Sequence, residues 1–194
     1  MRITAPQWTG AKEKFVDDLF AWLSSAGAAH YDDEQVTQLQ HALQTAEIAR
    51  QAQASKQGIV AALLHDIGHL LIHEPQGTDD LLGRNLQHEE VGAQWLASFF
   101  PPEVVEPIRL HVLAKRWLCT VDEAYWHGLS DASKRSLLMQ GGRMCGAEIM
   151  AFQTHASWGR AVALRQRDDL GKQPGKHAPC LESFRPAVLQ VLKA

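Results

Sequence analysis

Apolar residues recur every three or four positions along most of the chain, and no segment shows the strict alternation typical of a half-buried strand. In the first such segment, Phe15, Leu19 and Leu23 share one side of a helix that ends before Gly27. The pattern therefore predicts an all-α fold built as a helical bundle. Apart from a central helix, we expect helices over residues 11–25, 35–53, 88–99, 102–113, 121–127, 130–139, 143–170 with a bend near Ser157, and 182–193.

The most apolar helix is expected to begin at Gln57-Gly58 and to contain His65, Asp66 and His69. It is apolar on nearly all sides, which is typical of a helix at the centre of a bundle. The segment 73–87 that follows is rich in turn-forming residues and predicts a long surface connection. Loops of this length in a compact domain are often functional.

The chain length favours a single domain. With 194 residues, the chain is long enough for one well-packed domain and short for two. Hydrophobic residues make up 45% and charged residues 21%, which are ordinary proportions for a soluble globular protein. No repeat, low-complexity tract or linker divides the sequence, so we expect one domain over residues 1–194.

Charge and cysteine content restrict the partners and the compartment. A net charge of −3 gives no reason to expect nucleic acid as a partner. No apolar stretch reaches the roughly 18 residues that a membrane span needs, and the N-terminal sequence lacks the pattern of a signal peptide. The three cysteines are scattered, which disfavours a disulfide framework. We expect a cytoplasmic protein whose partner is a small molecule, with no nucleic-acid or membrane partner.

The dipeptide His65-Asp66 stands inside the apolar run of residues 59–71. A carboxylate buried there without a partner would lose several kcal/mol of hydration. A bound metal ion removes that cost, because imidazole and carboxylate groups are metal ligands. The dipeptide therefore predicts a metal site.

Other residues of the same kind complete the expected ligand set, which is large enough for two ions. We expect one ion to be held by His41, His65, Asp66 and Asp168, and the other by Asp66, His88 and His111, with Asp66 as the bridge. Ligands without thiolate suit iron, manganese or zinc. Such a site leaves coordination positions open for chemistry.

Each ligand also has a simpler interpretation. A lone histidine such as His41 or His111 is often a hydrogen-bonded core residue, and His88 is also explained as a residue that begins a helix. Asp168 is also explained by pairing with a nearby cation such as Arg165 on a solvated face. The buried Asp66 has no such explanation, so the metal hypothesis depends on it most.

The set His41, His65-Asp66 and Asp168 resembles the His…His-Asp…Asp signature of the HD-domain superfamily, and the resemblance covers most of the chain. It implies a single HD domain with a helical-bundle fold. Most members of this superfamily are phosphohydrolases or phosphodiesterases. The additional His88 and His111 are similar to those of its dinuclear members.

A narrower resemblance is to the mixed-valent diiron oxygenases of phosphonate catabolism, the PhnZ-type enzymes, which are related to myo-inositol oxygenase. It implies two iron ions as Fe(II)/Fe(III), O2 as co-substrate, and cleavage of a C–P bond. At position 167 this chain has Arg where the family often has Trp, and this position is not a ligand. The segments that carry the resemblance are residues 31–44, 62–71, 110–118, 129–142 and 164–172.

The same resemblance implies further site residues. Tyr31 and Glu34 correspond to a Tyr-x-x-Glu loop, in which the tyrosine occupies the open iron position until substrate arrives. Glu34 then receives a cationic group of the substrate, and His69 donates to the phosphonate. The implied catalytic residues are Tyr31, Glu34 and His69, and the implied substrate contacts are Glu34, His69, Lys115, Ser133 and Arg165.

The residues themselves support part of this set. A phosphonate dianion needs cationic donors, and Lys115 lies one helical turn after His111. The alternative for Lys115 and Arg165 is ordinary surface charge. For Ser133 it is a simple helix cap, and for the acidic run at Glu34 it is a favourable helix start.

Two functions therefore remain open, because the full ligand set disfavours a third class, a non-catalytic metal-binding or signalling HD domain. The first is an O2-dependent diiron oxygenase that cleaves the C–P bond of a 1-hydroxyphosphonate, namely 1-hydroxy-2-aminoethylphosphonate or its N-trimethyl analogue, to phosphate and glycine or glycine betaine. The alternative is a dinuclear HD-domain phosphohydrolase or phosphodiesterase. Both would use nearly the same ligands, so ligand count does not separate them.

Overall fold

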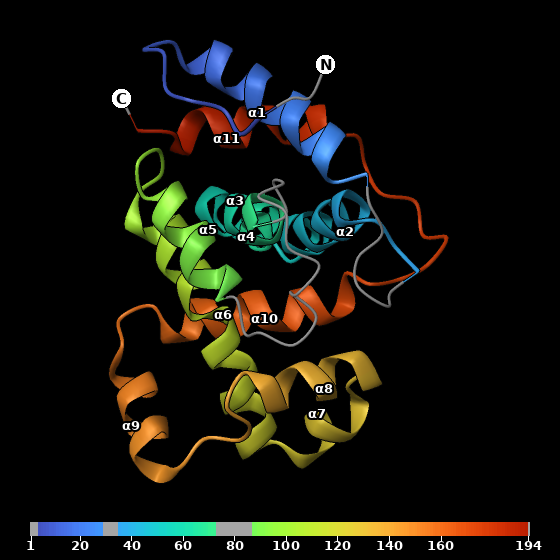
Figure 1. Cartoon of the computed structure of the whole chain (residues 1–194), viewed down its shortest axis with the longest axis vertical. Helices are drawn as coiled ribbons and strands as arrows, with labels where there is room; N and C mark the ends of the chain where they lie inside the picture. Colours follow the sequence, from blue (N-terminus) through green and yellow to red (C-terminus); the bar gives the residue numbers. More distant parts are fainter. Residues whose placement is uncertain (1–3, 29–34, 73–86, 194) are drawn as a thin grey trace.

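The computed structural model describes residues 4–28, 35–72 and 87–193, and these residues form helices without a β-strand (Figure 1). The all-α prediction is confirmed. The helices are α1 (Lys12–Ala26), α2 (Gln38–Gln51), α3 (Lys56–Leu64), α4 (Ile67–Ile72), α5 (His88–Leu96), α6 (Pro102–Val121), α7 (Glu123–Gly128), α8 (Asp131–Met139), α9 (Gly146–Thr154), α10 (Trp158–Leu170), the short 3-10 helix η1 (Leu181–Phe184) and α11 (Arg185–Val191).

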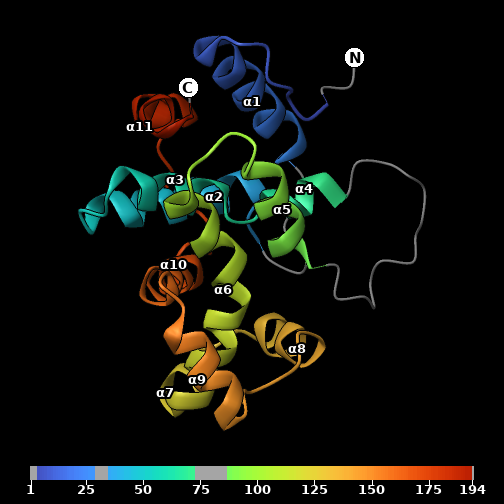
Figure 2. The same ribbon diagram turned by 90° about the vertical axis from the view of Figure 1, so that its left-hand side faces the viewer.

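The helices form successive tiers along the long axis of the molecule. At one end, α1 lies near α11, close to both chain ends, in Figure 1 and in the perpendicular view of Figure 2. The middle tier contains α2 to α5, with α6 and α10 beneath it, and α7 to α9 form the opposite end. The metal-ligand candidates come from the middle tier and from the two helices beneath it.

One large hydrophobic core joins the first and last helices to the middle of the chain. Phe15 and Trp22 of α1 are fully buried in it, together with Leu64 of α3 and Ile108 of α6. Val188 of α11 belongs to the same cluster. This shared core supports the expected single domain over residues 1–194, which stays a prediction. No helix among the described residues is long and apolar enough to cross a membrane.

Local sequence explains where two of the site helices begin. Thr37 accepts a hydrogen bond from the Gln40 amide, and the Gln40 side chain accepts one from the Thr37 amide, so a capping box starts α2. Pro102 occupies the first turn of α6, where a missing N–H costs nothing. α6 then continues to Val121 rather than ending near residue 113. The apolar pattern did not predict this extension, because it is interrupted by Lys115, a charged residue that is buried on the inner face of the helix.

The expected central helix is divided in the structure. α3 ends at Leu64 and α4 begins at Ile67, so His65 and Asp66 form a turn between two helices. The expected region over residues 143–170 is likewise two helices, with α9 ending at Thr154 and α10 beginning at Trp158. The prediction of one continuous helix through the His-Asp pair was wrong. The apolar pattern runs through the turn because residues on both sides of it are buried.

Two glycines allow α4 and α5 to pack backbone against backbone. A Cβ added at Gly68 would lie 1.9 Å from the carbonyl oxygen of His88, and one added at Gly92 would lie 3.1 Å from the amide nitrogen of Gly68. No other residue type fits at Gly68 without moving α5. This contact holds His88, the first residue of α5, beside the Asp66 turn.

We expect the substitution Gly68→Ala to destabilise the fold by about 1–3 kcal/mol, because overpacking forces backbone shifts. Denaturation with urea would measure the loss. The matched control is Gly159→Ala, at an exposed position of α10 where an added Cβ meets nothing within 4 Å. The control is expected to raise stability by roughly 0.5–1 kcal/mol, since alanine is the better helix former. Equal effects of the two substitutions would contradict the close helix contact.

Candidate metal centre

Six buried side chains from five parts of the chain meet at one place. None of these residues is more than 9% exposed. They are His41 of α2, His65 and Asp66 of the turn between α3 and α4, His88 of α5, His111 of α6 and Asp168 of α10. The structure therefore brings together all six residues that the sequence analysis expected to hold metal.

The first group surrounds one oxygen of the Asp66 carboxylate. Asp66 Oδ2 lies 3.5 Å from His41 Nε2 and 3.4 Å from His65 Nε2. The two Nε2 atoms are 3.1 Å apart, and His41 Nε2 is also 3.1 Å from Asp168 Oδ1. Two imidazole nitrogens and two carboxylate oxygens thus face a common point.

The second group surrounds the other oxygen of the same carboxylate. Asp66 Oδ1 lies 3.7 Å from His88 Nε2 and 3.7 Å from His111 Nε2. These two nitrogens are 3.1 Å apart. Asp66 therefore stands between the groups, with one oxygen facing each, which is the geometry of a carboxylate that bridges two cations.

The backbone orients three of the four rings. A carbonyl oxygen only accepts hydrogen bonds, so an Nδ1 that faces one must carry the proton, and the Nε2 of that neutral ring then offers a lone pair. Such rings are ready to bind metal. The Nδ1–carbonyl pairs are His41 with Gly171 at 3.1 Å, His65 with Ala62 at 2.9 Å, and His111 with Ile108 at 2.7 Å.

A close helix contact places Asp168 beside His41. α10 ends just before Gly171, and an added Cβ at Gly171 would lie 2.2 Å from Thr45 Oγ1 in α2. The glycine allows the end of α10 to approach α2. The Gly171 carbonyl then receives His41 Nδ1–H, and the last turn of α10 presents Asp168 to the first group.

The charges in this centre call for a cation. Asp66 Oδ2 and Asp168 Oδ1 are buried and accept no hydrogen bond within the described part of the chain. Burial disfavours ionisation of both carboxyls, yet the pKa of each is held well below its usual value, chiefly by His65 at Asp66 and by Arg165 at Asp168. Two carboxylates that stay ionised, together with facing imidazole lone pairs, fit bound metal ions.

The histidines respond to this charge in opposite ways. Burial lowers the pKa of His41, but the adjacent carboxylates of Asp168 and Asp66 outweigh it and raise the pKa from 6.5 to about 9. Without a metal, a proton on His41 would balance part of the negative charge. Burial lowers the pKa of His111 to about 4 and that of His88 well below 6.5, so these rings are neutral at neutral pH.

His69 lies next to the second group. Its ring stacks on that of His88, with centroids 3.9 Å apart and planes at 19°. It also offers a nitrogen within ligand spacing of Asp66 and His88. This position suits the expected contact of His69 with a substrate bound beside the second group.

Lys115 is buried, so the interpretation of this residue as ordinary surface charge is wrong. Its side chain is 3% exposed, and its ammonium donates to Ser136 Oγ at 2.5 Å and Gln140 Oε1 at 3.1 Å. Burial, followed by the charges of Arg165 and Lys172, lowers the pKa of Lys115 from 10.5 to about 7. The ammonium thus lies in the interior with neutral hydrogen-bond partners.

Arg165 is also buried, and it is fully engaged with carboxylates. Its Nη1 donates to Asp168 Oδ2 at 2.5 Å, and its other nitrogens donate to Asp169. Tyr125 accepts from Arg165 Nε at 3.1 Å and donates to Asp169 Oδ2 at 2.5 Å. Because Arg165 holds one oxygen of Asp168, the other oxygen faces His41. No sequence signal identified Tyr125 or Asp169 as a partner of Arg165.

Ser133 and the N-terminal loop residues complete the expected set. Ser130, not Ser133, caps α8, because the Ser130 hydroxyl accepts from the Ser133 amide at 3.2 Å. The interpretation of Ser133 as a cap is therefore wrong, and its side chain is buried. Tyr31 and Glu34 lie outside the described residues.

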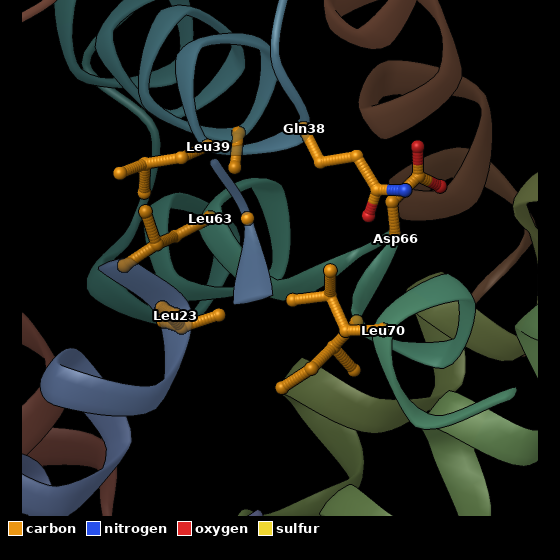
Figure 3. A pocket seen from close by; sticks show the side chains of 9 residues that line it. Leu23, Gln38, Leu39, Leu63, Asp66 and Leu70 are labelled. Atoms are coloured by element: carbon orange, nitrogen blue, oxygen red, sulfur yellow. The ribbon is translucent and has the colours of Figure 1, made fainter. Parts of the chain in front are cut away.

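A pocket borders the Asp66 carboxylate on the side of α1 and α2 (Figure 3). Gln38 reaches towards Asp66 in this view, and its Oε1 atom is buried without a hydrogen-bond partner among the described residues. The remaining described lining is apolar or glycine. It consists of Leu23, Gly27, Leu39, Ala42, Leu63, Ile67 and Leu70.

Comparisons with known proteins place these residues in a wider context. A family model described as HD domain matches residues 39–138, which include every ligand candidate except Asp168. The chain is 47% identical to hydroxymethylphosphonate dioxygenase of Gimesia maris over 92% of this chain and 88% of that protein. It is 38% identical to [1-hydroxy-2-(trimethylamino)ethyl]phosphonate dioxygenase (glycine-betaine-forming) of Leisingera caerulea, over 86% of this chain and 84% of that protein.

The bridging geometry predicts a distinctive pattern of metal loss. In titrations of metal-free protein with Co²⁺, we expect two bound ions for the native chain. His41→Ala and His111→Ala should each weaken one of the two ions, whereas Asp66→Ala should weaken both because its two oxygens serve both groups. Metal analysis after dialysis would count the ions. An Asp66→Ala protein that keeps one ion at native affinity would contradict the shared carboxylate.

Proposed function

From the premise that this chain belongs to the HD-domain family, and within it to the phosphonate dioxygenases, we propose that it cleaves the C–P bond of a 1-hydroxyphosphonate with O2. The observation that carries the proposal is a carboxylate with one oxygen facing each of two histidine pairs, in a chain 47% identical to a phosphonate dioxygenase. The similarity to two dioxygenases favours this function over the phosphohydrolase alternative, which would use the same ligands.

The proposed reaction balances without a further reductant. A 1-hydroxyphosphonate and one O2 give a carboxylic acid and inorganic phosphate, and both oxygen atoms enter the products. The carbon that carries the hydroxyl group loses its hydrogen and its bond to phosphorus and is oxidised to the carboxyl level. A hydrolase would instead add water and leave the oxidation state of that carbon unchanged.

The proposed cofactor is a pair of iron ions, Fe(II) and Fe(III). His41, His65, Asp66 and Asp168 would hold one, and Asp66, His88 and His111 the other. When bound, the irons supply the redox chemistry with O2 that amino-acid side chains lack. The buried oxygens of Asp66 and Asp168 that accept no hydrogen bond among the described residues support this fit. So does the ligand set of imidazole and carboxylate without thiolate.

The protein's own cations and hydroxyl groups would hold the phosphonate. We assign this role to His69, Lys115, Ser133 and Arg165. Lys115 is the strongest candidate, because its hydrogen bonds go to neutral groups and its charge is available to a dianion. Arg165 is already paired with Asp168 and Asp169, so its first effect is to orient Asp168.

Three substrates are candidates. The name of the Gimesia relative gives hydroxymethylphosphonate, which would yield formate, and the name of the Leisingera relative gives the trimethylamino compound, which yields glycine betaine. The third is 1-hydroxy-2-aminoethylphosphonate, which would yield glycine. The higher identity to the Gimesia protein puts hydroxymethylphosphonate first. Tyr31 and Glu34 are proposed to guard the site and to receive a cationic nitrogen where the substrate has one.

The decisive experiment measures O2 uptake and phosphate release by iron-loaded protein with each candidate in turn. We expect one phosphate for each O2 consumed, and no phosphate under anaerobic conditions. A phosphomonoester serves as the control substrate and should not be cleaved. Phosphate release at the same rate without O2 would instead establish the hydrolase.

The lowered pKa of Lys115 predicts a pH dependence of substrate capture. The lysine is a cation below about pH 7 and loses its charge as the pH rises through that value. We therefore expect kcat/KM for the phosphonate to fall above about pH 7. In Lys115→Arg, the guanidinium stays charged over this range, and the fall should disappear. Because both proteins use the same substrate, its own ionisation cancels in the comparison. Identical pH profiles would remove Lys115 from this role.

A further inference from the structure

The four ligand histidines are not held in the same way. For His41, His65 and His111, the acceptor beside Nδ1 is a neutral backbone carbonyl. For His88, the group beside Nδ1 is a side-chain carboxylate, because Nδ1 lies 3.5 Å from Glu89 Oε2. One ring of the second group is therefore backed by a negative charge.

Glu89 is unusual among the acidic residues at this end of α5. Its side chain is 14% exposed, and Oε2 is buried without a hydrogen-bond partner among the described residues. The adjacent Glu90 is 50% exposed and pairs with Arg109. A buried carboxylate oxygen that accepts no hydrogen bond is costly. The nearby imidazole N–H of His88 is the group that would offset this cost.

The two groups differ in negative charge, and this difference suggests what the contact between His88 and Glu89 does. In the first group, two carboxylates, Asp66 and Asp168, face the metal position. In the second group, His88 and His111 share only the other oxygen of Asp66. A divalent or trivalent ion at the second position would be less well neutralised. A carboxylate behind His88 supplies the missing negative charge through the ring.

We propose that Glu89 is a positioning residue that accepts the Nδ1–H of His88 and strengthens the binding of metal by His88 and His111. The inference rests on the proposed two-metal function and deepens it. A carboxylate partner fixes the ring orientation and makes the opposite nitrogen a stronger donor. The second ion would therefore be bound more tightly than by His88, His111 and one oxygen of Asp66 alone.

The test compares Glu89→Gln with Glu90→Gln. Glutamine keeps the shape of the side chain and can still accept a hydrogen bond, but it removes the charge. In Co²⁺ titrations of metal-free protein, Glu89→Gln is expected to weaken one of the two bound ions by about 10–100-fold and to leave the other unchanged. Glu90→Gln, one residue further along α5, should change neither.

Two double variants show which of the two ions is weakened. In His41→Ala, which retains the second group, adding Glu89→Gln should weaken the remaining ion. In His88→Ala, which retains the first group, the same addition should have no effect. Urea denaturation of Glu89→Gln and of Glu89→Ala, without metal, separates loss of metal from loss of fold. Both variants are expected to unfold at the midpoint of the native chain.

The outcomes separate this inference from the proposed function. Superimposable Co²⁺ titrations of Glu89→Gln and native protein would overturn it, and so would equal weakening of both ions. A native chain that binds two Co²⁺ ions but, with iron, releases no phosphate from any candidate substrate would contradict the proposed function. The Co²⁺ titrations would still decide the role of Glu89 in that case, because they do not involve turnover.

Discussion

The candidate metal centre is organised around one buried carboxylate that two groups of histidines share. Asp66 lies at the meeting point of the middle-tier helices and the helices beneath them, and each of its oxygens faces a different pair of rings. Such an arrangement is unfavourable in an empty hydrophobic interior. The surrounding structure therefore holds the ligands together against their electrostatic cost, through close helix contacts at Gly68 and Gly171. Bound cations would turn this cost into stabilisation.

The sequence was sufficient to predict the all-α fold and the meeting of the six ligand candidates, because buried histidine and aspartate side chains interrupt an otherwise apolar pattern. It was not sufficient to predict the turn at His65-Asp66, since apolar residues on both sides of the turn continue the helical spacing. It also did not predict the full length of α6, because Lys115 is a charged residue on a buried face. The pattern of apolar and polar positions records only whether a residue is polar, so it cannot distinguish a buried charged residue from one at the surface.

The residues that were not predicted from the sequence do not face the metal positions themselves. They contact and orient the residues that were predicted. Tyr125 and Asp169 hold Arg165, and Arg165 holds one oxygen of Asp168. Their partners are distant in the chain, as Tyr125 and Asp169 are 44 residues apart. No spacing rule connects such residues. They meet because the Tyr125 side chain of α7 reaches the last turn of α10, and the sequence alone gives no sign of this contact.

The backbone partners of three histidines limit how this centre can change in evolution. A carbonyl that orients His65 or His111 belongs to a residue three positions earlier in the same helix segment, and replacing that residue's side chain leaves the carbonyl in place. These ring orientations are therefore largely insensitive to substitution of their partners. At His88 the neighbour is a side chain, so a single codon change at Glu89 alters it. Natural variation or protein engineering can therefore change the surroundings of the second histidine group by substituting Glu89, while the first group keeps its backbone partners.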